Sequence, residues 1–299
     1  MSAPQPAVME RRYSRRVRFA DFFELTKPGI TTMVLITTLV GYYMASRNGL
    51  RPLLLLHTIL GTALVAGGAS GLNQYFERNL DARMHRTRNR PLPAGRLFPN
   101  EALFFSMIIS VVGVADLMFF VNILTGVLGL MTLAAYIFVY TPLKTRTALC
   151  TLIGAFPGAT PPVMGWTAAG GDIDAVALSL FAILFLWQMP HFFAIAWMCR
   201  EDYLRAGFRM ISSDDSSGER SASQSVFFCI LLLVLAGLPA FVGIASYVYQ
   251  PIELVLGGLF VAVAMRFLRL RTPSAARLLF FASIAYLPLL LAALVLTKL

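Results

Sequence analysis

The sequence predicts an all-α membrane protein with nine transmembrane helices. Of its 299 residues, 58% are hydrophobic and only 13% are charged, which is far more apolar than an ordinary soluble domain. A helix needs about 20 mostly apolar residues to cross the hydrocarbon, and nine stretches meet that length. The expected spans are 29–46, 53–72, 101–119, 123–141, 149–168, 176–198, 225–247, 252–268 and 278–297.

Short polar connections separate these spans, so we expect one transmembrane domain over residues 29–299. Before it, residues 1–28 are polar and basic, and they predict a flexible cytoplasmic tail. All but three of the 25 Lys and Arg residues then lie on the side of the tail; the exceptions are Arg47, Arg51 and Lys298. This asymmetry follows the positive-inside rule. The net charge of +10 therefore needs no nucleic-acid partner.

The compositions of two spans predict how their helices pack and where they end or bend. The span 53–72 ends in "GGASGLNQYFE", whose small residues allow another helix to approach closely, and we expect its helix to continue to Asn89 before Pro91 and Pro93 stop it. The span 149–168 contains "GAFPGATPPVMGW". Its glycines and prolines indicate either a broken helix beside a central cavity or a kink that serves packing.

The first polar loop carries the residues that point to chemistry. On a helix, Asn73, Glu77 and Asp81 are spaced four apart and share one stripe. Two carboxylates that close repel each other unless a cation bridges them. Mg²⁺ fits that need, since it takes oxygen ligands and completes its shell with water and phosphate oxygens.

Basic residues near this stripe are suited to phosphate. Arg86 and Arg90 follow it in sequence, and a guanidinium matches phosphate geometry. Lys144 and Arg146, in "YTPLKTRT", lie on the same side of the membrane. The alternative is that these charges form solvated helix ends and interface anchors, because carboxylates at this spacing are common on exposed helices.

A second acidic cluster follows the span 176–198. The segment "FLWQMPHFFAIAWMCREDYLRAG" places Glu201 and Asp202 on the same membrane face as the first stripe, with arginines nearby. Two such clusters indicate a pair of Mg²⁺ sites for a diphosphate. His191 lies deeper in the span, where a substrate contact and a hydrogen-bonded packing role are equally open.

The chain resembles the UbiA superfamily of intramembrane prenyltransferases, and within it the protoheme IX farnesyltransferases, or haem O synthases. Four segments carry the resemblance: "LTKPGITTMVLITTLVGYYMA", "LNQYFERNLDARMHRTRNRPLPAGRL", "YTPLKTRTALCTLIGAFPGATPPVMGW" and "WQMPHFFAIAWMCREDYLRAG". The Asn-x-x-x-Glu-x-x-x-Asp spacing is typical of the superfamily. The Pro-His-Phe segment and the Gly-Ala-x-Pro-Pro-x-x-Gly-Trp segment are typical of the haem-directed branch.

The resemblance implies a site and its residues. Nine helices would surround a central cavity with a diphosphate site at its cytoplasmic mouth. Asn73, Glu77 and Asp81 match the first metal-diphosphate motif, and Asp202 matches the second, with Glu77, Asp81 and Asp202 as metal ligands. His191 would serve the haem through its iron or a propionate.

The resemblance also implies a reaction. The protein would transfer the farnesyl group of farnesyl diphosphate to a vinyl group of haem b, with Mg²⁺ as cofactor and addition of water, giving haem O and diphosphate. It would lie in the bacterial inner membrane with its N-terminus in the cytoplasm. Its implied protein partners are haem A synthase or assembly factors of a respiratory oxidase.

One segment departs from the family pattern. After Gly207 the family continues with prolines, whereas this chain reads "FRMISSDDSSGERSASQS". We expect Asp214 and Asp215 to be solvated, with a role as extra metal ligands as the alternative. Other functions remain open on the pattern alone. A quinone- or chlorophyll-directed prenyltransferase would share the first motif, a transporter would place its acids near the midplane, and a structural assembly factor would need no acidic motifs.

Overall fold

The computed structural model describes residues 15–47 and 49–299, and these residues form helices joined by turns. The first half contains α1 (Arg15–Leu25), α2 (Pro28–Ala45), α3 (Pro52–Asp81), α4 (Pro99–Asp116), α5 (Ile123–Ala134), α6 (Thr141–Leu143) and α7 (Cys150–Ala168), with π-helical segments η1 (Leu117–Val121) and η2 (Ala135–Tyr140). The second half contains α8 (Ala175–Met198), α9 (Arg200–Ala206), α10 (Glu219–Leu235), α11 (Leu238–Phe241), α12 (Tyr249–Leu270) and α13 (Pro273–Leu296).

The predicted all-α polytopic fold is confirmed. Eight segments in the described part of the chain are long and apolar enough to cross a membrane, and the ninth predicted span coincides with the 19-residue helix α7. Two of the eight segments join an α-helix to a π-helix: α4 continues into η1, and α5 continues through η2 into α6. A π-turn offsets the hydrogen-bonding register and often occurs at functional positions, and η2 leads directly into a polar segment.

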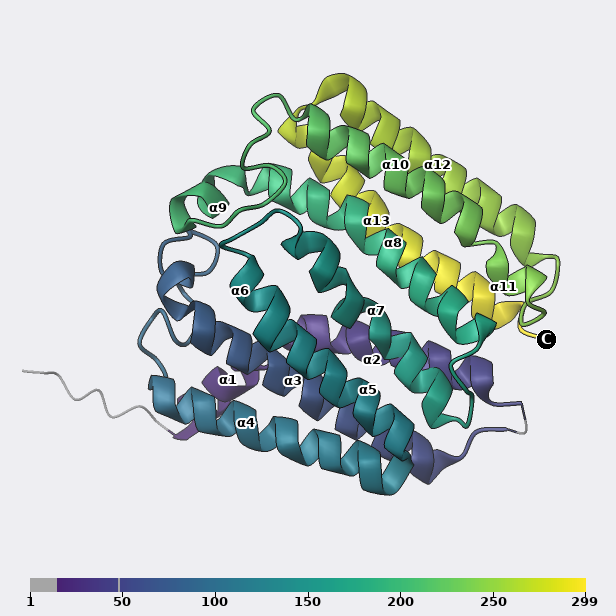
Figure 1. The fold of residues 1–299 in the computed structure, drawn as a ribbon, viewed down its shortest axis with the longest axis horizontal. Coiled ribbons are helices and arrows are strands. Elements are labelled where there is room, and N and C mark those ends of the chain that lie inside the picture. Colours follow the sequence, from purple (N-terminus) through teal and green to yellow (C-terminus); the bar gives the residue numbers. More distant parts are fainter. Residues whose placement is uncertain (1–14, 48) are drawn as a thin grey trace, which may run out of the picture.

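The helices form two groups (Figure 1). In one group α8 packs against α10 and α13, and α12 packs against α10 and α13. In the other, α3 packs against α4 and α2 packs against α7, while α7 also contacts α8 and so joins the two groups. The segments that follow α3, α6 and α8 all gather beside α9, at one end of the bundle (Figure 1). We call this end the α9 end.

Helix α7 remains continuous despite its three internal prolines, Pro157, Pro161 and Pro162. It packs closely on α2, with no room for side chains at two glycines. A Cβ atom at Gly41 would lie 1.9 Å from the carbonyl oxygen of Pro162, and one at Gly165 would lie 1.9 Å from that of Thr38. The glycine- and proline-rich sequence thus serves a close helix pair, in which backbones meet without intervening side chains.

Two expectations from the sequence are wrong, one about the end of α3 and one about the N-terminal tail. Helix α3 ends at Asp81, not at Asn89, because the chain turns back and the Thr87 hydroxyl donates to the Asp81 carbonyl oxygen at 2.8 Å. Residues 15–25 of the predicted flexible tail form α1. This helix is tethered by ion pairs of Arg18 with Glu101 and of Asp21 with Arg96. The rest of the tail, residues 1–14, lies outside the described residues.

The last helix is tied to the first span at the opposite end of the bundle. The Lys298 ammonium donates to the carbonyl oxygens of Tyr43, at 2.6 Å, and Ser46, at 2.8 Å. It also lies 4.4 Å from the centre of the Tyr43 ring. A cation at these carbonyl oxygens is stabilised by the negative end of the α2 dipole. The Lys298 side chain therefore caps α2 and joins it to α13.

Helix packing at α2 and α7 makes a testable prediction. Gly165→Ala places a methyl group against the backbone of α2, which cannot move aside as a side chain could, so we expect a loss of about 1–3 kcal/mol of stability. The measurement is the temperature at which the detergent-solubilised protein loses its monodisperse elution peak. Gly258→Ala is the matched control, since a Cβ there meets nothing within 4 Å. Equal melting of both variants would contradict the close packing.

Candidate active site

The Asn73, Glu77 and Asp81 side chains lie on one stripe at the end of α3, as their spacing predicts. All three are buried, with relative exposures of 1%, 5% and 1%. Buried carboxylates are costly unless cations or hydrogen bonds compensate them. Each of the three side chains is met by a basic residue from a different segment of the chain.

Glu77 is paired with Lys144, which follows α6. The Lys144 ammonium donates a hydrogen bond to Oε2 of Glu77 at 3.0 Å and lies 2.7 Å from Oε1. It also sits 4.5 Å from the centre of the Tyr140 ring, at the end of η2. Burial lowers the pKa of Lys144, but Tyr140 and Glu77 outweigh that effect and raise it above its ordinary value. Lys144 therefore stays charged in this buried place.

Asp81 is paired with Arg90, from the turns that follow α3. Nη1 of Arg90 donates to Oδ2 of Asp81 at 2.7 Å. The other oxygen, Oδ1, is buried and has no hydrogen-bond partner among the described residues. The early end of α3 makes this pair possible, because a helix continuing to Asn89 would carry Arg90 away from Asp81.

Lys27 is a site residue that the sequence pattern did not predict. Its ammonium donates to Oδ1 of Asn73 at 3.1 Å, while the Asn73 amide donates to the Thr141 hydroxyl at 3.2 Å. Burial, with the positive charges of Arg90 and Lys144, lowers the pKa of Lys27 to about 7. Its backbone has φ 50°, a left-handed conformation that is uncommon outside glycine and often marks functional sites.

Asp202 lies beside the loop that follows α3. Its carboxylate accepts hydrogen bonds from the backbone N–H groups of His85 and Arg86, both at 3.3 Å, and pairs with Arg205 at 2.9 Å. Partial burial raises the pKa of Asp202, but these donors and Arg205 outweigh it, so the pKa lies below its ordinary value. Asp202 thus fastens α9 to the loop.

The remaining predicted phosphate-binding residues are not paired with the carboxylate stripe. The Arg86 guanidinium donates to the hydroxyl of Tyr203, on α9, at 3.1 Å. Arg146 is exposed on the turn after α6. Arg90 and Lys144 therefore contact the stripe directly, whereas Arg86 and Arg146 lie outside it.

His191 packs in the interface between α8 and α13. Its ring lies 5.0 Å from the rings of Trp187 and Phe280, and Nδ1 is 2.7 Å from the hydroxyl of Ser283. The Ser283 hydroxyl donates its hydrogen to the Phe280 carbonyl oxygen at 2.6 Å, so it accepts the hydrogen on Nδ1. This assignment leaves Nε2 with a lone pair that can bind a metal or accept a hydrogen bond.

The two aspartates of the divergent loop differ from each other. Asp214 is exposed, as expected, but Asp215 is buried, so the expectation that both are solvated is wrong for Asp215. Its Oδ2 accepts hydrogen bonds from the backbone N–H and the hydroxyl of Ser221, both at 2.8 Å. Satisfying a free N–H in the first turn of α10 is the role of a capping residue.

The carboxylate oxygens of this cluster meet part of what a hard divalent cation needs. Oδ1 of Asp81 is buried and has no partner, and Glu77 offers a second carboxylate one turn away on the same helix. In the described part of the chain no three His, Cys, Asp or Glu side chains converge on one point. Water and substrate oxygens would therefore complete the shell, as Mg²⁺ commonly requires. The cluster can bind a polyanion through its basic residues and a metal through its carboxylates.

Comparison with other proteins identifies the family. The model of the UbiA prenyltransferase family matches residues 34–287, which run from within α2 to within α13. The chain belongs to the UbiA prenyltransferase family. A protoheme IX farnesyltransferase of Solibacter usitatus is 43% identical to it over 90% of this chain and 96% of that protein. One of Koribacter versatilis is 41% identical over 93% of each.

Solved structures of UbiA proteins share this fold. A digeranylgeranylglyceryl phosphate synthase superposes with a TM-score of 0.79 at 18% identity, covering 94% of this chain and 98% of that one. A UbiA homologue from Archaeoglobus fulgidus bound to GPP and Mg²⁺ has a TM-score of 0.69 at 14% identity, with 92% and 99% covered. At these identities the likeness establishes the helix arrangement.

The Lys144–Glu77 pair makes a prediction about stability. Lys144→Met leaves Glu77 buried without its cation, and breaking such a pair by removing one partner costs about 3–5 kcal/mol. Adding Glu77→Gln should recover most of that loss, because a neutral amide needs no counter-charge. The measurement is the thermal midpoint of each purified variant. A double variant as unstable as Lys144→Met would contradict the pairing.

The Asp215 cap makes a second prediction. At neutral pH, Asp215→Asn should lower stability by about 1 kcal/mol, whereas Asp214→Asn, the exposed control, should have no effect. Hydrogen bonds from Ser221 and neighbouring backbone groups outweigh burial and lower the pKa of Asp215. Its stabilisation is therefore present above the ordinary carboxyl pKa and is lost as pH falls through the lower folded value. Thermal midpoints across acidic pH would measure this, and a pH-independent difference between variant and parent would contradict it.

Proposed function

We propose that this protein transfers the farnesyl group of farnesyl diphosphate to a vinyl group of haem b, with addition of water, giving haem O and diphosphate. The observation that carries the proposal is the similarity to protoheme IX farnesyltransferases over nearly the whole chain, at 43% identity with that of Solibacter usitatus. The buried cluster of basic and acidic side chains at the end of α3 supports it, because such a cluster suits a diphosphate.

The chain's own groups would hold the diphosphate. Lys27, Arg90 and Lys144 already converge on the α3 stripe, and their charges would stabilise the negative charge that develops as the diphosphate leaves. Arg86 and Arg146 lie on adjacent loops and would contact its outer oxygens. Asn73 would orient the same group through its amide, which the Thr141 hydroxyl positions.

Glu77 and Asp81 would hold Mg²⁺, with Asp202 serving a second position from α9. When bound, Mg²⁺ would supply positive charge that neutralises the departing diphosphate. The ion pairs Glu77–Lys144 and Asp81–Arg90 would then exchange partners, so that each carboxylate faces the metal and each basic side chain faces the substrate. This exchange keeps every buried charge compensated.

The transfer would need no protein nucleophile. As the allylic carbon–oxygen bond breaks, its electron pair stays with the diphosphate, and the vinyl π electrons form the new carbon–carbon bond. Water then adds to the cation beside the porphyrin ring and loses a proton. His191 would hold the haem through Nε2, at its iron or a propionate, because Ser283 fixes the orientation of the ring.

We infer that the α9 end faces the cytoplasm of a bacterial cell, with the protein in the inner membrane. The basic residues concentrate on that side, which supports the orientation through the positive-inside rule. Farnesyl diphosphate would then enter from the cytoplasm. Haem A synthase or assembly factors of a respiratory oxidase would receive the product.

The decisive experiment incubates membranes containing the protein with haem b, farnesyl diphosphate and Mg²⁺, and analyses extracted haems by chromatography and mass spectrometry. A haem carrying a hydroxyethylfarnesyl group is the expected product. Chelation of Mg²⁺ should abolish its formation. If membranes with folded protein give none, the haem-directed assignment fails, and other aromatic acceptors would be tested next.

Glu77→Gln should reduce turnover by at least about 100-fold, because it removes a metal-facing charge while the amide keeps the shape of the side chain. Asp214→Asn, an exposed acid of the same membrane face, is the matched control and should retain full activity. Elution as a folded species verifies each variant. Normal turnover in Glu77→Gln would exclude the metal role of that carboxylate.

A further inference from the structure

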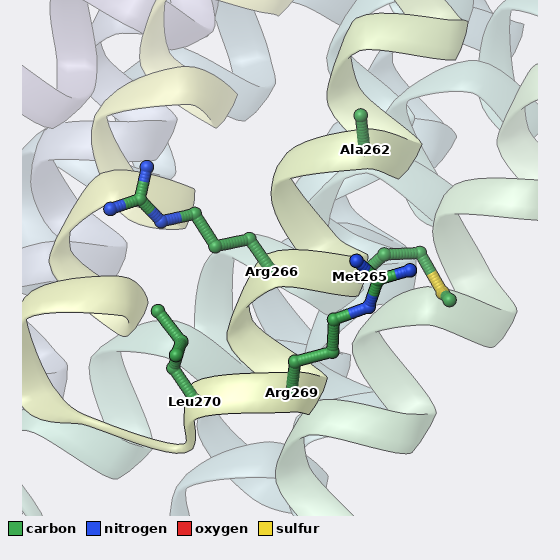
Figure 2. A pocket seen from close by; sticks show the side chains of 5 residues that line it. All are labelled: Ala262, Met265, Arg266, Arg269 and Leu270. Carbon is green, nitrogen blue, oxygen red and sulfur yellow. The ribbon is translucent and has the colours of Figure 1, made fainter.

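Basic side chains outside the carboxylate cluster do not all converge on a ligand. A groove on α12 is lined by Ala262, Met265, Arg266, Arg269 and Leu270 (Figure 2). The guanidinium groups of its two arginines extend to opposite sides of the helix, and the positive-inside rule accounts for such residues. Lys27 differs, because its ammonium is directed at Asn73 on the carboxylate stripe. The turn between α1 and α2 has to hold Lys27 in that direction.

This turn keeps Lys27 in an uncommon backbone conformation. Its φ of 50° and ψ of 64° are left-handed, and Pro28 follows it directly. A residue other than glycine keeps such a conformation only where the surrounding contacts enforce it. One of these contacts comes from α2, where the Thr31 hydroxyl donates to the Thr26 carbonyl oxygen at 2.9 Å. Another comes from α3.

Gln74, the neighbour of Asn73 on α3, supplies that second contact. Its side chain is buried, and its amide donates to the carbonyl oxygen of Leu25 at 2.7 Å. Leu25 is the last residue of α1, so its carbonyl group is one that a helix leaves without an intrahelical donor. No backbone N–H of the described residues donates to it. Gln74 therefore satisfies the end of α1 two residues before Lys27.

Other contacts attach α1 to the bundle. Asp21 and Glu24 pair with Arg96, from the segment that follows α3, and the Leu25 side chain is fully buried. We therefore expect α1 to stay docked when the Gln74 hydrogen bond is removed. The bond acts where α1 ends and the turn begins, so its loss should change the direction of Lys27 more than the attachment of the helix.

We propose that Gln74 is a positioning residue for diphosphate binding and acts through Lys27. This inference rests on the proposed function, in which Lys27 holds the diphosphate. Asn73 and Gln74 are consecutive on α3 and hold one segment at two points. Asn73 accepts a hydrogen bond from the Lys27 ammonium, and Gln74 fixes the backbone at Leu25. Without the second point, the turn can relax and carry the ammonium away from the substrate.

The test measures binding of farnesyl diphosphate with Mg²⁺ to the full chain in detergent by calorimetry, in the absence of haem. Lys27→Met should raise the Kd by about 10–100-fold, as expected for a hydrogen bond to a charged group. Gln74→Met keeps the length of the side chain but cannot donate, and it should raise the Kd about tenfold. The double variant should bind like Lys27→Met alone, because residues that act through one another are not additive.

Turnover separates this role from a general loss of structure. Gln74→Met should raise the KM for farnesyl diphosphate and leave the KM for haem b unchanged. The matched control is Gln250→Met, because Gln250 also donates its amide to a backbone carbonyl oxygen, that of Gly237, at 3.1 Å, and lies outside the cluster. It should bind farnesyl diphosphate like the parent. Thermal midpoints check that each variant is folded.

A second variant tests the same turn from α2. Thr31→Val removes the hydroxyl that donates to Thr26 and should also raise the Kd for farnesyl diphosphate, so it decides the question if Gln74→Met does not fold.

The inference is overturned if the parent does not bind farnesyl diphosphate, or if Lys27→Met or a folded Gln74→Met binds it like the parent. It is also overturned if Gln250→Met weakens binding as much as Gln74→Met, or if the effects of Lys27→Met and Gln74→Met add. Absence of a haem product from a parent that binds farnesyl diphosphate would instead contradict the proposed function.

Discussion

The burial of two carboxylates at the end of one helix is the constraint on which the rest of the site depends. Glu77 and Asp81 cannot remain charged in that place without cations, and the chain supplies cations from distant segments. Lys144 comes after α6, and Arg90 comes from the turns after α3. Lys27, at the start of α2, joins them through Asn73. Charge compensation therefore sets where three separate segments must lie at the α9 end.

Local features of this site were predictable from sequence, because they depend on helical periodicity and hydropathy. The spacing of Asn73, Glu77 and Asp81 places them on one stripe whatever the rest of the fold does. The apolar stretches likewise fix the spans, since the membrane sets their length. The glycines and prolines of α7 marked it as an unusual span, but the helix is continuous and not broken.

Features that depend on tertiary contacts were not predictable. The end of α3 at Asp81 requires Thr87 and Arg90 to fold back. The sequence indicates that Arg90 suits phosphate, but not that it pairs with Asp81. Lys27 resembles an interface anchor before a proline, and only the structure shows that it reaches Asn73. Asp215 appears in a serine-rich loop of the kind that is usually solvated, yet the first turn of α10 recruits it. In each case the contact depends on a partner distant in sequence or on a turn of the chain. The sequence pattern alone does not reveal either.

The link between Lys298 and the end of α2 has a consequence for assembly of the protein in the membrane. The two contacting segments are about 255 residues apart in sequence, and contacts of such separation form after the local ones. The earlier spans can pack on one another first, since α2 contacts α3 and α7, but the end of α2 stays open until α13 arrives. During that interval the polar carbonyls at the end of α2 lack their cation. The end of α2 is therefore completed later than the rest of that helix.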